Sequence, residues 1–393
     1  MGAGMQQTVE KVFFALIRFE INGDELCGEM KNLITPEVLP ALFKLSKRHD
    51  LAHLIADALD KNCLLPDGTE AKKRFLQERN MSVYRYEQIQ YEFEQICDAL
   101  EKAKIPFIPL KGSVIRQYYP EPWMRTSCDI DILVKESMLE ETARFLCAQL
   151  GYESEEQKTV NELSLFSPSG VHLELHYDLT EGDKYGKDIL SHIWDYTTLK
   201  EEGASWYLLS DSAFYFYHIA HMVKHFEHGG CGVRPFLDLW LLKNKVSYNQ
   251  VEKDELLQQG GFLKFAKASE ELSTIWFGKQ DMSELGERLQ SYILTGGVYG
   301  TLQNRVGMQQ SKKGGKIKYI LSRIFISNKE LKIKYPQVEK HPWLAPFYHI
   351  KRWIKPLTQK QSRNASLTEL SETSSVEEMT RKENIRLLQD LGL

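Results

Sequence analysis

The chain has 393 residues, of which 42% are hydrophobic and 26% are charged, and its formal net charge is −4. That length accommodates two or three domains with an ample core, whereas the small negative charge excludes a globally basic nucleic-acid-binding protein. The six cysteines are scattered without a Cys-x-x-Cys pair, which excludes a zinc knuckle and a disulfide framework and favours a reducing cytoplasm. We expect no signal peptide and no transmembrane segment.

The first predicted region, residues 1–104, is helical. Apolar residues recur with helical spacing in residues 39–45 and 51–59, and a longer helical stretch covers residues 70–103. Prolines and a Pro66-Asp67-Gly68 turn divide this region into separate helices. We expect a helical subdomain that packs on a catalytic sheet or lines its cleft.

A short apolar run at residues 107–110 leads into Lys111-Gly112-Ser113, and residues 114–119 have a helical pattern. A strand, a Gly-Ser turn and a helix in this order are typical of phosphate binding. Glycine lets the backbone approach an anion, serine adds a hydroxyl donor, and the helix N-terminus supplies unpaired N–H groups. The turn alone is weak evidence, and it gains weight because an acid pair follows within 20 residues.

That acid pair belongs to residues 129–134, where Asp129 and Asp131 alternate with aliphatic residues as in a β-strand. The period of two places both carboxylates on one face, with Cα atoms about 6.6 Å apart. Two carboxylates at that spacing can share one metal ion or bridge two. The alternative is a solvated edge strand.

After the acid pair, residues 139–150 form a predicted amphipathic helix that ends at Gly151. Residues 162–166 and a Ser167-Pro168-Ser169-Gly170 turn then predict a hairpin that leads into residues 171–176. This order favours a small mixed α/β domain over a doubly wound sheet.

The last strand of that hairpin alternates, with His172, Glu174 and His176 on one face and aliphatic residues on the other. Glu174 is therefore the best candidate for a third carboxylate beside Asp129 and Asp131. Asp178 is a competing acid of lower weight.

Four histidines, His218, His221, His225 and His228, recur at spacings that place them on one helix face. Zinc binding is a minor alternative, because the spacings that mark structural zinc are missing. We favour a polar face that lines a nucleotide cleft, where Lys224, His225 and Arg234 can meet phosphates. A partly buried helix with satisfied histidines fits equally well, and Arg234 could instead pair with Asp238.

Residues 245–360 are predicted to be helical, and part of this region is strongly basic. Between positions 312 and 334 the only acid is Glu330, beside Lys312, Lys313, Lys316, Lys318, Arg323, Lys329, Lys332 and Lys334. A basic amphipathic surface could touch anionic lipid, an acidic partner or RNA, although a solvated helix face is the simpler explanation. Residues 361–380 have the composition of a flexible linker, and residues 382–391 could form a short docking helix.

Together these motifs resemble the DNA polymerase β-like nucleotidyltransferase superfamily, and most closely an uncharacterised bacterial nucleotidyltransferase family. The matching residues are Lys111-Gly112-Ser113, Tyr119-Pro120, Arg125, Asp129-Ile130-Asp131, Gly151-Tyr152 and Glu174-Leu175-His176. The similarity is best between residues 105 and 180. We therefore expect an α+β fold with a small mixed-sheet core at residues 105–200. Helical regions would flank it at 1–104 and 201–360, and a linker and terminal helix would follow at 361–393.

The resemblance implies metal-dependent transfer of a nucleoside monophosphate from an NTP to an acceptor, with release of pyrophosphate. Asp129 and Asp131 would hold Mg²⁺ or Mn²⁺, and Glu174 would complete the site and help to activate the acceptor. Gly112 and Ser113 would hold the triphosphate. The remaining motif residues expected to contact the nucleotide are Lys111, Arg125 and His176.

The acceptor class stays open at this level, between a small molecule, a sugar phosphate, a protein and RNA. Two other classes of function also remain as alternatives. One is a catalytically degenerate protein that binds a nucleotide or a partner, as in an antitoxin-like module. The other is a scaffold for surface-polymer or peptide-natural-product assembly, suggested by the large helical flanks.

Overall fold

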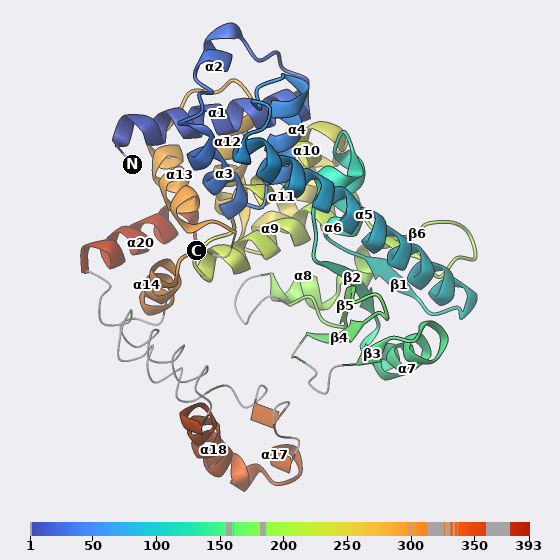
Figure 1. Cartoon of the computed structure of the whole chain (residues 1–393). Helices are drawn as coiled ribbons and strands as arrows, with labels where there is room; N and C mark the ends of the chain where they lie inside the picture. The colour runs from blue at the N-terminus through green and yellow to red at the C-terminus, as the bar shows by residue number, and fades with distance from the viewer. Residues whose placement is uncertain are drawn as a thin grey trace.

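The structure is a computed structural model that describes residues 2–154, 159, 161–180, 186–298, 300–312, 326, 331–332, 335, 337–358 and 378–393. It is an α+β protein in which a small sheet is set against a larger body of helices (Figure 1). This architecture confirms the predicted fold class. The predicted domain boundaries stay a prediction.

The N-terminal part is helical, as expected from its periodicity. Its long helix α5 begins after Thr69, whose hydroxyl accepts a hydrogen bond from the Lys72 backbone N–H at 3.2 Å, as an N-terminal cap does. The helices are α1 (Ala3–Asn22), α2 (Gly28–Asn32), α3 (Leu39–Arg48), α4 (Ala52–Lys61) and α5 (Glu70–Lys102).

The sheet has five strands in the order β1-β2-β5-β4-β3. Strands β2 and β5 are parallel, and the other neighbouring pairs are antiparallel. Its strands are β1 (Phe107–Pro109), β2 (Asp129–Val134), β3 (Glu153–Ser154), β4 (Glu162–Phe166) and β5 (His172–His176). The mixed topology confirms the small mixed sheet expected from the hairpin pattern.

Between β2 and β3 lies α7 (Leu139–Leu150), which ends at Gly151 in a left-handed conformation with φ of 70°. The two faces of the sheet differ in character. Ile130, Ile132 and Val134 of β2 belong to one hydrophobic cluster with buried residues of α5 and α7. Because side chains alternate along a strand, Asp129 and Asp131 lie on the opposite face.

A second sheet pairs β6 (Thr197–Leu199) with β7 (Tyr207–Leu209), a hairpin that the sequence pattern did not predict. After it the chain is again helical. The elements are α8 (Lys187–Ser191), which precedes β6, then α9 (Asp211–Glu227), α10 (Arg234–Lys245), α11 (Gln250–Gln259), α12 (Leu263–Phe277) and α13 (Glu284–Gly296).

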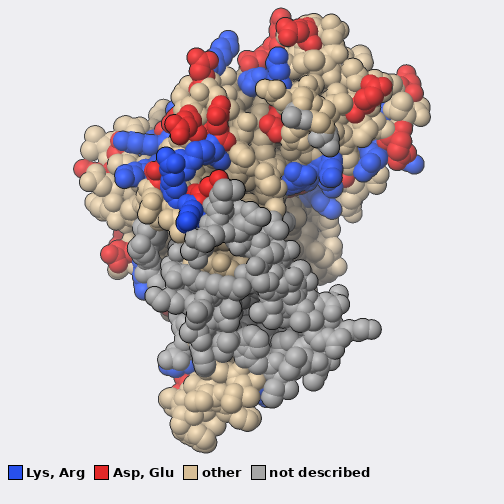
Figure 2. Space-filling view, turned by 90° about the vertical axis from the view of Figure 1, so that its left-hand side faces the viewer, with Lys and Arg blue, Asp and Glu red and all other residues tan. Residues whose placement is uncertain are grey.

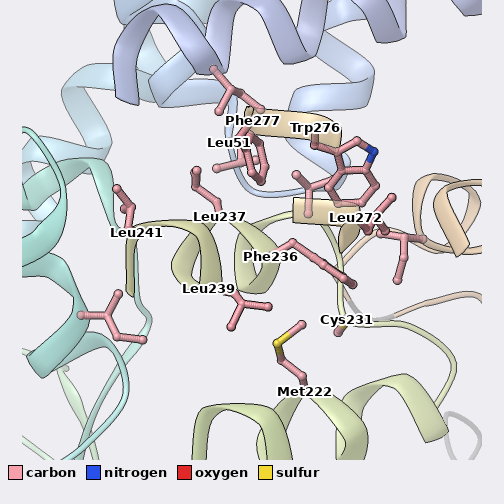
Figure 3. Close-up of a cluster of buried hydrophobic side chains, with 14 of the residues drawn as sticks. Leu51, Met222, Cys231, Phe236, Leu237, Leu239, Leu241, Leu272, Trp276 and Phe277 are labelled. Atoms are coloured by element: carbon pink, nitrogen blue, oxygen red, sulfur yellow. The ribbon is translucent and has the colours of Figure 1, made fainter. Parts of the chain in front are cut away.

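The helical body has one large hydrophobic cluster that contains residues from both ends of the chain. Figure 3 shows part of it, where Phe236 and Leu237 of α10 lie near Trp276 of α12 and Met222 of α9. Helix α1 joins this cluster by stacking Phe14 on Trp276, with ring centroids 4.9 Å apart.

Two polar contacts fix α1 on the end of α12. The Arg18 guanidinium donates to the Trp276 carbonyl at 2.8 Å, and the Asn22 amide donates to the Phe277 carbonyl at 2.7 Å. Charged and amide donors at a helix C-terminus satisfy carbonyls that have no partner within the helix. The N-terminal helix is thereby held by a helix more than 240 residues further along the chain.

The C-terminal elements are α14 (Leu302–Lys312), α17 (Gln337–Lys340), α18 (Ala345–Thr358) and α20 (Glu378–Leu391). The predicted docking helix exists, but it begins at Glu378 rather than at Lys382. It is docked, because Leu387, Leu388 and Leu391 are buried in the large cluster. Most of the basic segment at 312–334 and the predicted linker up to residue 377 lie outside the described residues.

Basic and acidic side chains lie side by side on the described part of the face in Figure 2. Among the helices that the structure describes, none is both long and apolar enough to cross a bilayer.

Candidate functional site

The predicted acid pair and the third acid meet on adjacent strands. In the parallel pairing of β2 with β5, Asp131 lies opposite Glu174 and Asp129 lies opposite His172. Opposite residues in neighbouring strands point to the same face, so the acids and histidines share the face away from α5 and α7. The alternation that the sequence predicted for both strands is confirmed.

Side-chain atoms of Asp131, Glu174 and His176 converge on one point. His176 Nε2 lies 2.8 Å from Asp131 Oδ1 and 3.4 Å from Glu174 Oε2. Asp129, His172 and Glu174 form a second group of the same kind, and in each group the ligand atoms lie within 4.8 Å of one another. Glu174 belongs to both groups and links them.

The donor atoms of these two groups fit a divalent metal. Carboxylate oxygens are the ligands preferred by Mg²⁺, and a mixture of carboxylate and imidazole also suits Mn²⁺. Asp178, the competing acid, belongs to neither group and instead accepts the Thr180 backbone N–H at 2.8 Å. The structure thus brings together the three acids that the sequence favoured.

Lys111 places its ammonium group directly on these acids. Lys111 Nζ lies 2.6 Å from Asp131 Oδ1 and 3.7 Å from Glu174 Oε2. Its backbone has φ of 45° and ψ of −119°, a conformation that residues with a side chain rarely adopt. The turn is held in place because the Leu110 N–H donates to the Asp131 carbonyl at 3.0 Å.

The pKa values of these groups show how strongly they interact. Burial and the negative charges of Asp131 and Glu174 raise the pKa of Asp129 to about 6. Burial alone would also raise the pKa of Asp131, but Lys111 and His176 hold it well below its usual range. Burial lowers the pKa of His176, yet its hydrogen bonds to Asp131 and Glu174 outweigh that effect and raise it to about 9.

The helix that follows the turn after β1 is shorter than predicted. Helix α6 (Gly112–Ile115) makes a single turn and is followed by the 3-10 helix η1 (Arg116–Tyr118), in place of a regular helix over residues 114–119. A Cβ atom at Gly112 would lie 3.3 Å from the Ser127 side chain, so the close packing of this turn favours glycine. Ser113 is the next residue, and its backbone N–H donates to the Leu110 carbonyl at 3.2 Å.

Arg125, the motif residue before the acid strand, is buried in a network with α10. Its Nε donates to both Asp238 carboxylate oxygens, at 2.8 and 3.0 Å, and the Tyr119 hydroxyl donates to the same group at 2.7 Å. The suggested pairing of Arg234 with Asp238 is wrong, because Arg234 pairs with Asp50 and Thr126. Arg125 holds the Tyr119 loop and β2 against α10.

Helix α9 brings two side chains toward the acids. Burial acts to lower the pKa of Lys111, but the charges of Asp131, Tyr217 and Glu174 raise it well above its ordinary value. Burial and the charge of Glu174 raise the pKa of Glu162, and the positive charges of His176, Lys111 and Lys224 only partly oppose this rise. His221 and His225 face each other with their Nε2 atoms 3.0 Å apart, whereas His218 contacts the Pro235 carbonyl at 3.0 Å. Neither acid–histidine group among the described residues contains a histidine of α9.

Two members of the site, His172 and Glu162, were given no role by the sequence analysis. The alternation of β5 already placed His172 on the face of Glu174, but it did not show that His172 lies opposite Asp129. Glu162 lies opposite His176 in the antiparallel β4–β5 pairing, with 3.5 Å between Glu162 Oε2 and His176 Nδ1. That contact depends on strand register, which the sequence did not reveal.

A comparison with protein families matched residues 37–278, more than half of the chain, to a family described as uncharacterised nucleotidyltransferase. The searches among curated proteins and among solved structures each found no match.

Proposed function

The chain belongs to the uncharacterised nucleotidyltransferase family, and we propose that it transfers a nucleoside monophosphate from an NTP to an acceptor in a metal-dependent reaction. Pyrophosphate is the leaving group. Family membership makes the protein a transferase. One observation carries the finer proposal, which is the convergence of Asp129, Asp131 and Glu174 across the β2–β5 pair.

Asp129, Asp131 and Glu174 are the proposed holders of Mg²⁺ or Mn²⁺. When bound, such an ion neutralises the charge that develops on the transferring phosphoryl group. The acids are arranged on two adjacent strands rather than on loops, and rigid placement of charged groups is what this chemistry requires of the protein. His172 and His176 add imidazole nitrogens to the same face.

The proposed nucleotide-binding residues surround this face. Gly112 and Ser113 offer a closely packed turn and a hydroxyl, and Lys111 offers an ammonium group next to the acids. Lys224 and His225 are proposed to meet the phosphates from α9.

Arg125 is proposed to act as a positioning residue rather than as a phosphate ligand. Its side chain is 9% exposed and is engaged by Asp238. A guanidinium that is buried against a carboxylate of α10 is shielded from solvent and is poorly placed to meet the phosphates of a nucleotide.

The test is calorimetric titration of the purified protein with Mg²⁺ or Mn²⁺ and each non-hydrolysable NTP, which needs no knowledge of the acceptor. We expect metal-dependent nucleotide binding in the wild type and its loss in the Asp129→Asn/Asp131→Asn variant. Asp178→Asn is the matched control, because Asp178 lies outside both acid–histidine groups. No binding by the folded wild type would refute the proposal.

A further inference from the structure

The side chain of Lys111 uses the oxygens that the proposed metal would use. Its Nζ contacts Asp131 Oδ1 at 2.6 Å and Glu174 Oε2 at 3.7 Å, and both atoms belong to the group that converges on His176. The Lys111 side chain is 20% exposed, whereas that of Asp131 is 4% exposed. The lysine therefore approaches the buried acids from the open side of the site.

The backbone conformation at Lys111 positions its side chain next to the acids. Its positive φ is retained although the residue has a full side chain, and the Lys111 carbonyl accepts N–H groups of Val114 and Ile115 at 3.1 and 3.0 Å. Pairing of β1 with β2 anchors the other side of the turn. The base of the lysine is thus fixed, while its four-carbon chain lets the ammonium group move.

An ammonium group and a divalent cation compete for these oxygens at close range. Metal–oxygen distances for Mg²⁺ are about 2.0–2.1 Å, comparable with the Lys111–Asp131 contact of 2.6 Å. Two positive charges that close repel strongly in a site shielded from water. This repulsion favours departure of the Lys111 ammonium group from the carboxylates when a divalent ion binds them.

We propose that Lys111 is an exchangeable counter-ion, which neutralises Asp131 and Glu174 and moves to the phosphates of the NTP when a divalent metal takes its place. This inference rests on the proposed function. The exchange couples the two ligands, because the metal releases the ammonium group that the nucleotide needs. Neither acid is left without a positive partner at any stage.

This arrangement predicts opposite effects of removing the Lys111 charge. Lys111→Met keeps an unbranched side chain but removes one of the two groups that hold the metal-binding oxygens, while His176 stays in place. Binding of Mn²⁺ alone should therefore tighten at least about fivefold, the lower end of typical coupling between ligands. Binding of a non-hydrolysable NTP at saturating Mn²⁺ should weaken by a similar factor. If Lys111 had only a structural role, its replacement would not change the Mn²⁺ affinity and the NTP affinity in opposite directions.

The experiment measures free Mn²⁺ by electron paramagnetic resonance and NTP binding by calorimetry. The matched control is Lys253→Met, because Lys253 is also a buried lysine paired with a carboxylate, at 3.1 Å from Glu270, but it lies outside the acid–histidine groups. This control should leave both affinities unchanged. If Lys111→Met binds Mn²⁺ no more tightly than the wild type, the inference is wrong. If the wild type binds neither probe, the proposed function itself fails.

A second measurement uses the wild type and so does not depend on the folding of a variant. Lysine methylation mapped by mass spectrometry should increase at Lys111 when Mn²⁺ is added and decrease again when the non-hydrolysable NTP follows. Lys253 is the internal reference. Labelling of Lys111 that does not respond to Mn²⁺ would overturn the exchange.

Discussion

Removing the charge of Arg125 should destabilise the protein strongly. Nucleotide binding should weaken only as far as the folded protein is lost. The change Arg125→Met leaves the Asp238 carboxylate, which is fully buried, without its positive partner. Breaking a buried ion pair by deleting one partner costs about 3–5 kcal/mol, a large part of the roughly 5–15 kcal/mol that typically stabilises a domain. Urea unfolding followed by circular dichroism measures the loss.

A double variant tests the cause of that loss. In Arg125→Met/Asp238→Asn the buried negative charge is gone, and the Asn carbonyl can still accept the Tyr119 hydroxyl that now donates at 2.7 Å. We expect the second change to restore most of the stability, because a neutral pair avoids the cost of an isolated buried charge. The reasoning is refuted if the free energy of unfolding of Arg125→Met lies within about 1 kcal/mol of the wild-type value and the variant nevertheless binds NTP much more weakly. That result would restore Arg125 as a direct nucleotide ligand.

Three further predictions concern other parts of the molecule. Burial alone would raise the pKa of Asp238, but Arg125 holds it below its ordinary value, so this pair should stabilise the protein above about pH 4 and lose that effect at lower pH. Leu391→Ala on α20 should cost about 2–5 kcal/mol in thermal or urea unfolding, because Leu391 is fully buried. On α18 and the turn before it, Trp343 and Phe347 are 75% and 60% exposed beside basic residues. Vesicles containing phosphatidylglycerol should co-sediment with the protein and release it as salt rises.

Each of these predictions has its own control. For Asp238, the acid-induced loss should be smaller in the Arg125→Met/Asp238→Asn variant, and an equal loss would contradict the assignment. For α20, Arg288→Met removes an exposed ion pair with Asp390 and should cost less than about 1 kcal/mol. For α18, a protein that fails to sediment with anionic vesicles even at low salt would exclude membrane contact.

Local patterns in the sequence were sufficient to predict the strands that carry the site. The alternation of acids with aliphatic residues placed β2 at residues 129–134, and helical spacing ended by glycine placed α7 at residues 139–150. Both features depend on neighbours within the same element, which is why periodicity detects them. The third acid followed from the alternation of β5.

Contacts between distant residues were not predictable in the same way. Arg125 and Asp238 are 113 positions apart, and the chain offers many other acids to a basic residue. The register that faces Asp131 with Glu174 depends on how two strands slide past each other, and the positive φ of Lys111 depends on the strands that hold its turn. These features arise from tertiary packing, to which single-sequence patterns are insensitive.

The docking of α1 on α12 also affects how the chain can fold during its synthesis. The partner of Arg18 is Trp276, 258 residues further along the chain. At about 5–20 residues per second, the ribosome needs roughly 13–50 s after Arg18 to synthesise the end of α12. Throughout that interval Phe14 of α1, which stacks on Trp276 in the finished fold, lacks this neighbour. The nascent chain is therefore a natural client for chaperones that shield hydrophobic helices until α12 has been synthesised.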